Sequence, residues 1–252
     1  MRKVKAYYTA VFIPDLSGLF FYPKKCGYIK MKNKKINVRV LCGMAMFTAL
    51  AVVAAAVTKW ITVAHLTFDA KDAVITVAAY IYGPISGIVI SLVSATVETL
   101  TMGGGTGWYG FMMDFLSSAT FSFIASGIYY KKRDINGAVL GLLAATAGNV
   151  GVMLLLNTFV APLYFGLPIF APYVMNMLPT LVLPFNLAKG LMNSAIAMFL
   201  YKPTVVALRR AKLTEGGSKD GLTFNRNTVL ILIFGSIGLV LSVAIFLMLL
   251  YL

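Results

Sequence analysis

Charged residues, cysteine and histidine are all scarce in this chain of 252 residues. Only 12% of the residues are charged, where soluble domains carry about 25%, and 60% are hydrophobic. The two cysteines, Cys26 and Cys42, and the single His65 offer neither a disulfide framework nor the ligand spacing of a metal site. These shortages argue against a soluble domain, and the composition predicts an all-α membrane protein that crosses the bilayer several times.

Acidic residues are also few, with 8 Asp+Glu against 22 Lys+Arg, and the excess of basic residues is clustered. Ten basic residues occur up to Arg39, three at 131–133 and six from Lys202 to Arg226, each cluster beside an apolar stretch. This positive-inside pattern argues against nucleic acid as a partner. It predicts a multi-pass protein of the plasma membrane with a cytoplasmic N-terminus.

The apolar stretches predict six membrane helices and an additional C-terminal one. Their expected positions are about 40–58, 72–82, 85–100, 108–130, 137–160, 179–203 and, for the additional helix, 228–252. Residues 73–100 could form one helix, but Gly83-Pro84 is a strong turn signal, and two helices also keep the later basic clusters inside. Segments 59–71, 101–107 and 160–178 are then external.

This parse divides the chain into four parts. They are an N-terminal cytoplasmic extension (1–37), a six-helix membrane domain that binds the substrate (38–203), a cytoplasmic linker (204–227) and the additional helix (228–252). A basic stretch begins at Met31, which favours Met31 as the natural start and residues 1–30 as an upstream extension of the reading frame. The alternative is a cytoplasmic tail.

Lys189 stands near the middle of the sixth predicted helix, between Asn186 and Asn193 on the same helix face. At about 1.5 Å per residue it lies ~15 Å from Pro179, too deep to reach either surface fully. A charge at that depth costs at least ~2.5 kcal/mol, so groups inside the bundle must accept its hydrogens. The sequence therefore predicts a functional site around Lys189.

Other polar residues of the predicted helices fall in the same outer half of the bundle. They include Glu98, Asp114 and Asn157. Acid, amide and lysine groups that converge below external loops are typical of a substrate site open to the outside. The alternative is that Glu98 and Asp114 serve only as counter-ions for Lys189 or Lys71.

Three stretches resemble a known family of transport proteins. LTFDAKDAVITVAAYIYGPISGIVISLV (66–93) is similar to the first external loop and the helix pair split by Gly-Pro in the S components, the substrate-binding membrane subunits of energy-coupling factor (ECF) vitamin transporters. NTFVAPLYFG (157–166) and LPFNLAKGLMNSAIAMFLYKP (183–203) resemble the riboflavin-specific type. The Asn-x-x-Lys at 186–189 is the most specific part. The family has six helices, so the C-terminal helix lies outside the resemblance.

The resemblance implies that the chain binds riboflavin as a transported ligand and needs no cofactor. The expected ligand contacts come from the helices and from the first external loop: Asn157, Asn186, Lys189, Leu66, Phe68, Asp69, Asp114 and Tyr164. Among these, Phe68 and Tyr164, together with Trp108, suit the flat ring, and Asp69 or Asp114 suits the ribityl hydroxyls. The small residues Ala45 and Ala49 are expected to dock on a transmembrane coupling subunit.

The energy source must come from other chains, because no ATP-binding motif occurs in the sequence. Two cytoplasmic ATPases are the expected partners. Alternatives are an S component for another vitamin and a stand-alone secondary transporter that uses Glu98, Asp114 and Lys189 as an ion relay. An enzyme with Asp114 and Glu98 as acid and base has no supporting nucleophile or cofactor motif, so the protein is predicted not to be an enzyme.

Overall fold

The computed structural model describes residues 38–59, 62–63, 66–102, 107–132, 135–210 and 226–250. These residues are almost entirely helical. The elements in chain order are α1 (Val38–Thr58), β1 (Thr62–Val63), β2 (Leu66–Thr67), α2 (Lys71–Tyr82), α3 (Pro84–Met102), α4 (Gly107–Lys131), α5 (Ile135–Phe165), α6 (Pro172–Met177), the π-helical turn η1 (Leu178–Val182), α7 (Leu183–Arg210) and α8 (Arg226–Leu250). The predictions for 1–37, and most of those for the linker, concern residues outside this description.

The break between α2 and α3 falls at the predicted Gly83-Pro84. Gly83 has a φ of 110°, a conformation that side chains strongly disfavour, and Pro84 begins the next helix where its missing N–H costs nothing. With 12 residues, α2 is about 18 Å long and too short to cross the ~30 Å hydrocarbon core. It is a buried half-length helix rather than a full span.

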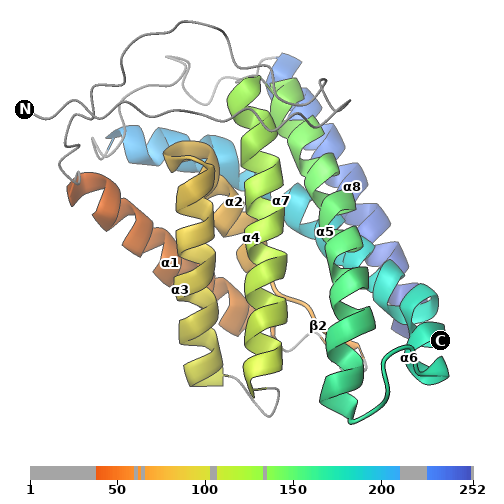
Figure 1. Cartoon of the computed structure of the whole chain (residues 1–252). Helices are drawn as coiled ribbons and strands as arrows, with labels where there is room; N and C mark the ends of the chain where they lie inside the picture. Colours follow the sequence, from red (N-terminus) through yellow and green to blue (C-terminus); the bar gives the residue numbers. More distant parts are fainter. Residues whose placement is uncertain are drawn as a thin grey trace, which may run out of the picture. The chain divides into compact units, whose positions relative to one another are not determined.

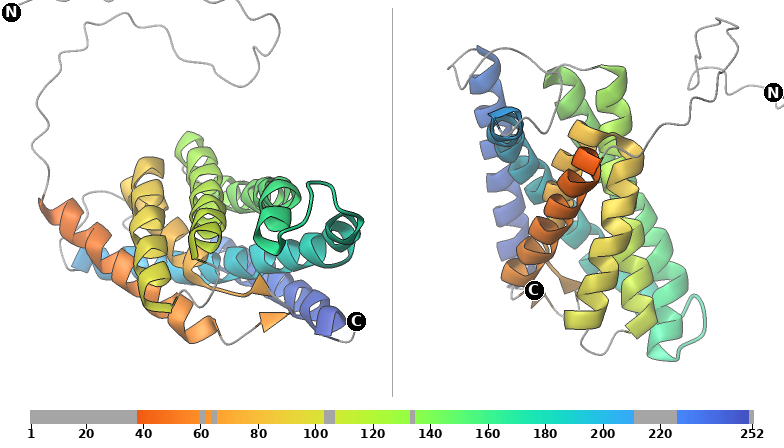
Figure 2. Two further views of the ribbon diagram at one scale, coloured as in Figure 1. Left: turned by 60° about the horizontal axis from the view of Figure 1, so that its bottom comes forward. Right: turned by 90° about the vertical axis from the view of Figure 1, so that its left-hand side faces the viewer.

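The short helix α2 occupies the centre of the bundle and contacts α1, α3, α4 and α7. Figures 1 and 2 show α3, α4 and α5 side by side on one side of the bundle, with α2 and α7 behind them. Nearly every side of α2 is covered, and Ile75 and Ala78 are fully buried. This central position places the first residues of α2, which are polar, inside the protein.

Two predicted loops differ in the structure. The first external segment forms a small antiparallel ribbon in which Thr62 pairs with Thr67. The predicted loop at 160–178 shrinks to residues 166–171, because α5 continues through Pro162 to Phe165 and because α6 and η1 lead directly into α7. A proline inside a helix removes one backbone hydrogen bond, which membrane helices tolerate when neighbouring groups compensate.

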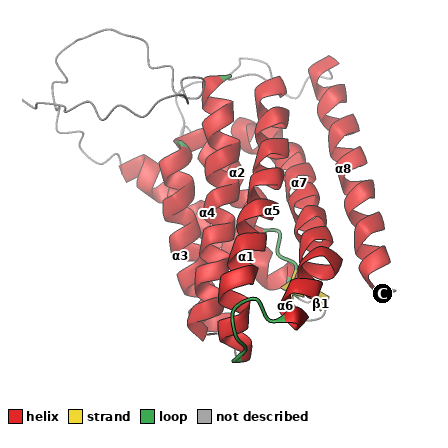
Figure 3. Ribbon diagram, turned by 45° about the vertical axis from the view of Figure 1, so that its right-hand side comes forward, coloured by secondary structure: helices red, strands yellow, loops and turns green. Residues whose placement is uncertain are grey.

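Five helical segments in the described part of the chain are long and apolar enough to cross a membrane: α1, α3, α4, α5 and the run from Pro172 to Tyr201. The C-terminal helix packs beside α7 (Figure 3), and its apolar part, Ile233–Leu249, is shorter than the predicted 228–252. The prediction of seven helices is therefore confirmed in part. The structure has five candidate spans, the short α2 and a shorter apolar C-terminal helix.

Candidate functional site

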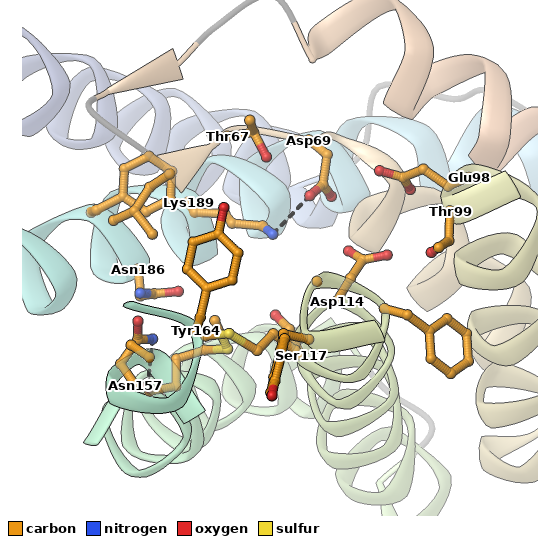
Figure 4. Close-up of a pocket in the computed structure, with 18 of the residues that line it drawn as sticks. Thr67, Asp69, Glu98, Thr99, Asp114, Ser117, Asn157, Tyr164, Asn186 and Lys189 are labelled. Carbon is orange, nitrogen blue, oxygen red and sulfur yellow. Dashed lines mark hydrogen bonds and ion pairs between the residues drawn. The ribbon is translucent and has the colours of Figure 1, made fainter. Parts of the chain in front are cut away.

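A cavity of about 340 Å³ lies between the first loop and helices α3, α4, α5 and α7. This volume is at the lower end of the ~300–1,000 Å³ typical of small-molecule sites. Figure 4 shows amide and lysine groups of α5 and α7 on one side of the cavity and carboxylates of α3 and α4 on the other. Lys189, Asn186 and Asn157 belong to the first group, and Glu98 and Asp114 to the second.

Lys189 lines this cavity and is ion-paired with the first loop. Its Nζ lies 2.8 Å from Asp69 Oδ2 and 3.8 Å from Asp72 Oδ2, and only 6% of the residue is exposed. Asn193, one turn further along α7, donates to the Asp69 carbonyl at 3.0 Å and accepts from the Ala73 N–H at 3.1 Å. The predicted acceptors inside the bundle therefore exist, and they come from the loop and the start of α2.

A second ion-pair network adjoins the first. Lys71, the first residue of α2, is fully buried and binds the carboxylates of Glu98 on α3 and Asp114 on α4. Lys59 lies 3.0 Å from the other oxygen of Glu98, at the more exposed edge of the cavity. Glu98 and Asp114 are thus ion-paired with Lys71 and not with Lys189, and both also line the cavity, so a role in binding stays a prediction.

The burial of Lys71 corrects its predicted place in an external segment. The residue is drawn inside because α2 begins in the middle of the bundle, where two acidic side chains from neighbouring helices meet it. The sequence carries one signal of this arrangement, which is that Asp69, Lys71 and Asp72 stand together at the start of an apolar helix. Taken together, the two networks contain three lysines and four carboxylates, so acidic groups are in excess.

Asp69 carries an acceptor without a partner in the described part of the protein. Its residue is 4% exposed, its Oδ2 pairs with Lys189, and its Oδ1 is buried without a hydrogen bond. Burial raises the pKa of the Asp69 carboxyl, but the ammonium groups of Lys189 and Lys71 outweigh burial and hold the pKa below its ordinary value. The residue lines the cavity as an ionised acceptor with capacity for a further hydrogen bond.

Asn157 on α5 and Asn186 on α7 form the polar part of the opposite wall. Each is almost fully buried, and each donates from Nδ2 to the backbone carbonyl four residues earlier at 2.8 Å. Neither side-chain oxygen accepts a hydrogen bond from the residues that the structure describes. Both amides are therefore held in fixed orientations and keep hydrogen-bonding capacity for a ligand in the cavity.

Only one of the three aromatic residues predicted to contact the ligand lines the cavity. Leu66 and Tyr164 line the cavity, together with Tyr109 and Phe111 of α4. Phe68 does not line it, because its ring is 2% exposed and packs against α8, with its centroid 6.4 Å from that of Phe246. The predicted stacking role of Phe68 is therefore wrong, since the loop turns this side chain away from the cavity.

Trp108 also lies outside the cavity lining, and it is 70% exposed. Its ring contacts Phe111 instead, with the two centroids 5.1 Å apart. The next residue, Tyr109 in the first turn of α4, does line the cavity. Trp108 and Tyr109 are neighbours in the sequence, and which of the two rings faces the cavity depends on how α4 is rotated about its axis.

The comparison with protein families identifies the class of protein to which this bundle belongs. A model for the substrate-specific component of ECF transporters matches residues 39–201, from the start of α1 to Tyr201 in α7. The chain belongs to this family, so it is a membrane transport protein and not an enzyme. The family implies association with an ECF energy-coupling module.

Individual relatives and a solved structure are similar to this chain. The chain is similar to the riboflavin transporter RibU of Staphylococcus aureus (strain TCH60), at 32% identity over 151 residues, which covers 58% of this chain and 78% of that one. It is 25% identical over 158 residues to the riboflavin transporter FmnP of Bacillus subtilis (strain 168), covering 59% and 83%. A solved S component of a bacterial ECF transporter superimposes with a TM-score of 0.58 at 28% identity, covering 69% of this chain and 99% of that structure.

Proposed function

We propose that this chain captures riboflavin, or a close flavin, from outside the cell for uptake driven by ATP. The observation that carries the proposal is the cavity in which Asn157, Asn186 and Lys189 converge with unused hydrogen-bonding capacity. The names of two relatives, both riboflavin transporters, support the same ligand. The ligand is the cargo, and no cofactor takes part.

The chemistry of a flavin suits the two walls of the cavity. One edge of its ring system carries carbonyl and imide groups, which the amides of Asn157 and Asn186 and the ammonium of Lys189 can bracket. Its flat apolar body suits Tyr164, with Tyr109 as a second aromatic neighbour. We infer that the ring lies toward α5 and α7.

The hydroxyl chain of the flavin would then lie toward the carboxylates. Asp69 offers a buried acceptor without a partner, and Asp114 lines the same side of the cavity. Hydroxyl groups both donate and accept, so they can complete such a site without adding charge. Leu66 and the neighbouring backbone would cover the ligand as part of a lid.

Transport also requires the partners named by the resemblance. Ala45 and Ala49 are exposed on α1, and we propose this face as the docking site for the transmembrane coupling subunit. Two cytoplasmic ATPase subunits would supply the work. The basic clusters give the proposed orientation, with the N-terminus in the cytoplasm and the first loop outside.

The test is the absorption spectrum of the detergent-purified protein, followed by titration with riboflavin while tryptophan fluorescence is recorded. Bound flavin makes the protein yellow and quenches the fluorescence. Asn157→Ala is expected to weaken binding by about tenfold or more, because a lost hydrogen bond inside a buried site is worth ~1–3 kcal/mol. Asn136→Ala is the matched control, since Asn136 is on the same helix and exposed.

A protein that remains colourless, shows no quenching by riboflavin and binds a different vitamin would reassign the ligand within the family. Equal riboflavin affinity in the Asn157 and Asn136 variants would show that the ligand does not bind through Asn157 and would contradict the cavity as its binding site. Uptake that continues without the ATPases and stops with an uncoupler would instead support a secondary transporter.

A further inference from the structure

The C-terminal helix α8 lies beyond residues 39–201, the part of the chain that matches the family. It nevertheless packs closely along α7 (Figure 3). A Cβ added at Gly235 would lie 2.8 Å from the ring of Phe199, so this side chain of α7 packs directly against the glycine of α8. Ser242 is fully buried and donates to the Ala188 carbonyl at 2.8 Å, next to Lys189 in the sequence.

The last two turns of α8 reach the loop that carries Asp69. Leu249 is 7% exposed and belongs to an apolar cluster with Leu66, Phe68 and Ala70. The Phe246 ring packs edge-on to Phe68 at 6.4 Å between centroids. The side of the loop away from the cavity is thus covered by α8, whereas Leu247 and Met248 on the same turns of α8 are exposed.

Segment 66–70 therefore has two faces with different tasks. Thr67 and Asp69 line the cavity, Phe68 and Ala70 belong to the cluster shared with α8, and Leu66 takes part in both. The segment also has polar contacts with the rest of the bundle: the Ala70 N–H donates to Thr58 Oγ1 at 3.0 Å, and Asp69 accepts hydrogen bonds from α7 at its carbonyl and its carboxylate. Apolar contacts with α8 on the other face add to these polar contacts in holding the segment against the bundle.

We propose that α8 is a positioning element of the binding site, in which Phe246 and Leu249 hold segment 66–70 inward so that Asp69 stays paired with Lys189 beside the cavity. Loss of this support lets the segment open more often, which speeds ligand release more than it slows ligand capture. The role of a flavin as the ligand rests on the proposed function above. The support of the loop by α8 does not depend on which ligand binds.

The test uses the full chain with Phe246→Ala/Leu249→Ala and the matched control Leu247→Ala/Met248→Ala. The control residues lie on the same two turns but are 50% and 67% exposed. Hydrogen exchange at 66–70, measured by mass spectrometry without ligand, is expected to be about tenfold faster in the first variant, because local opening depends on the packing that is removed. The dissociation rate of riboflavin is expected to rise by a similar factor, about tenfold.

A milder variant, Phe246→Leu, keeps most of the apolar contact and is expected to restore most of the protection, which separates positioning from general misfolding. Exchange at 66–70 that is the same in the two double variants would overturn the proposal, whatever the ligand is. Faster exchange together with no riboflavin binding in any variant, including the wild type, would support the role of α8 and contradict the proposed ligand.

Discussion

Removing Lys189 in a chain that already carries Asp69→Asn isolates the contact between this lysine and the ligand. In the wild type, Lys189 Nζ lies 2.8 Å from Asp69 Oδ2 and 3.8 Å from Asp72 Oδ2. Lys189→Met alone would therefore remove a ligand donor and also leave buried acids without their counter-ion. Once residue 69 is neutral, the second substitution removes the donor to the ligand and, of these two acids, takes a cationic neighbour only from Asp72, which lies farther away.

The two effects are measured as different quantities, which are the affinity for the ligand and the free energy of unfolding. Hydrogen bonds that involve a charged group are worth ~1.5–3 kcal/mol, which corresponds to a loss of about 10- to 150-fold in affinity between Asp69→Asn and the double variant. Lys189→Met alone breaks a buried ion pair and should lower the free energy of unfolding by ~3–5 kcal/mol. For a protein of this size that is a decrease in Tm of about 6–20 °C.

The assay is a riboflavin titration of the wild type, both single variants and the double variant, followed by quenching of tryptophan fluorescence. Trp108 is next to Tyr109, which lines the cavity, so its emission should report on the ligand. Thermal melting of the same four proteins without ligand measures the counter-ion role separately. Lys59→Met is a matched control, because Lys59 also lines the cavity but its side chain is 27% exposed, and its effect should stay below about fivefold.

Equal affinity of Asp69→Asn and the double variant would show that Lys189 only balances the charge of Asp69. The predicted ligand contact of the lysine would then be wrong, even if Lys189→Met alone abolished binding through loss of stability. A further loss of affinity from Asp69→Asn to the double variant, with no matching loss when Lys59 is replaced, is the result that the geometry predicts.

Three further predictions concern other parts of the bundle. Lys71→Met should lower the free energy of unfolding by ~3–5 kcal/mol, seen as a lower Tm, because it removes the shared partner of the buried Glu98 and half-buried Asp114 carboxylates. A Tm unchanged from the wild type would contradict this. Gly141→Ala should cost ~1–3 kcal/mol, since its Cβ would lie 2.6 Å from a backbone carbonyl of α4, whereas Gly151→Ala on the same helix meets nothing and should be neutral or stabilising in a thermal melt. Ala45→Leu/Ala49→Leu should leave riboflavin affinity unchanged but prevent co-purification with the coupling subunit, and recovery of the intact complex would refute the proposed docking face.

Features fixed by local physics were predictable from the sequence. The Gly83-Pro84 break depends on a positive φ and a missing N–H, both of which belong to the two residues themselves. The need for buried partners around Lys189 followed from the cost of a charge inside a membrane helix. Neither argument requires knowledge of which helices are neighbours, so both features could be predicted from the sequence and both are present in the structure.

Features that depend on a distant partner were not predictable in the same way. Lys71 stands beside two acids in the sequence and reads as a solvated loop residue, yet its carboxylate partners come from α3 and α4. Phe68 reads as a ring for stacking, but α8 arrives from the far end of the chain to bury it. The continuation of α5 through Pro162 likewise depends on neighbours that no local pattern reveals.

The segment that was hardest to predict is also the one that ties the site together. Asp69 faces the cavity, Phe68 faces α8, and Lys71 enters the network of α3 and α4 within four consecutive residues. Asp69 Oδ1 is buried and no described residue donates to it, an arrangement that ordinarily costs ~1–3 kcal/mol. If the proposed ligand donates a hydrogen bond to this oxygen, ligand binding and the inward position of segment 66–70 are expected to stabilise each other, because the hydrogen bond exists only in that position.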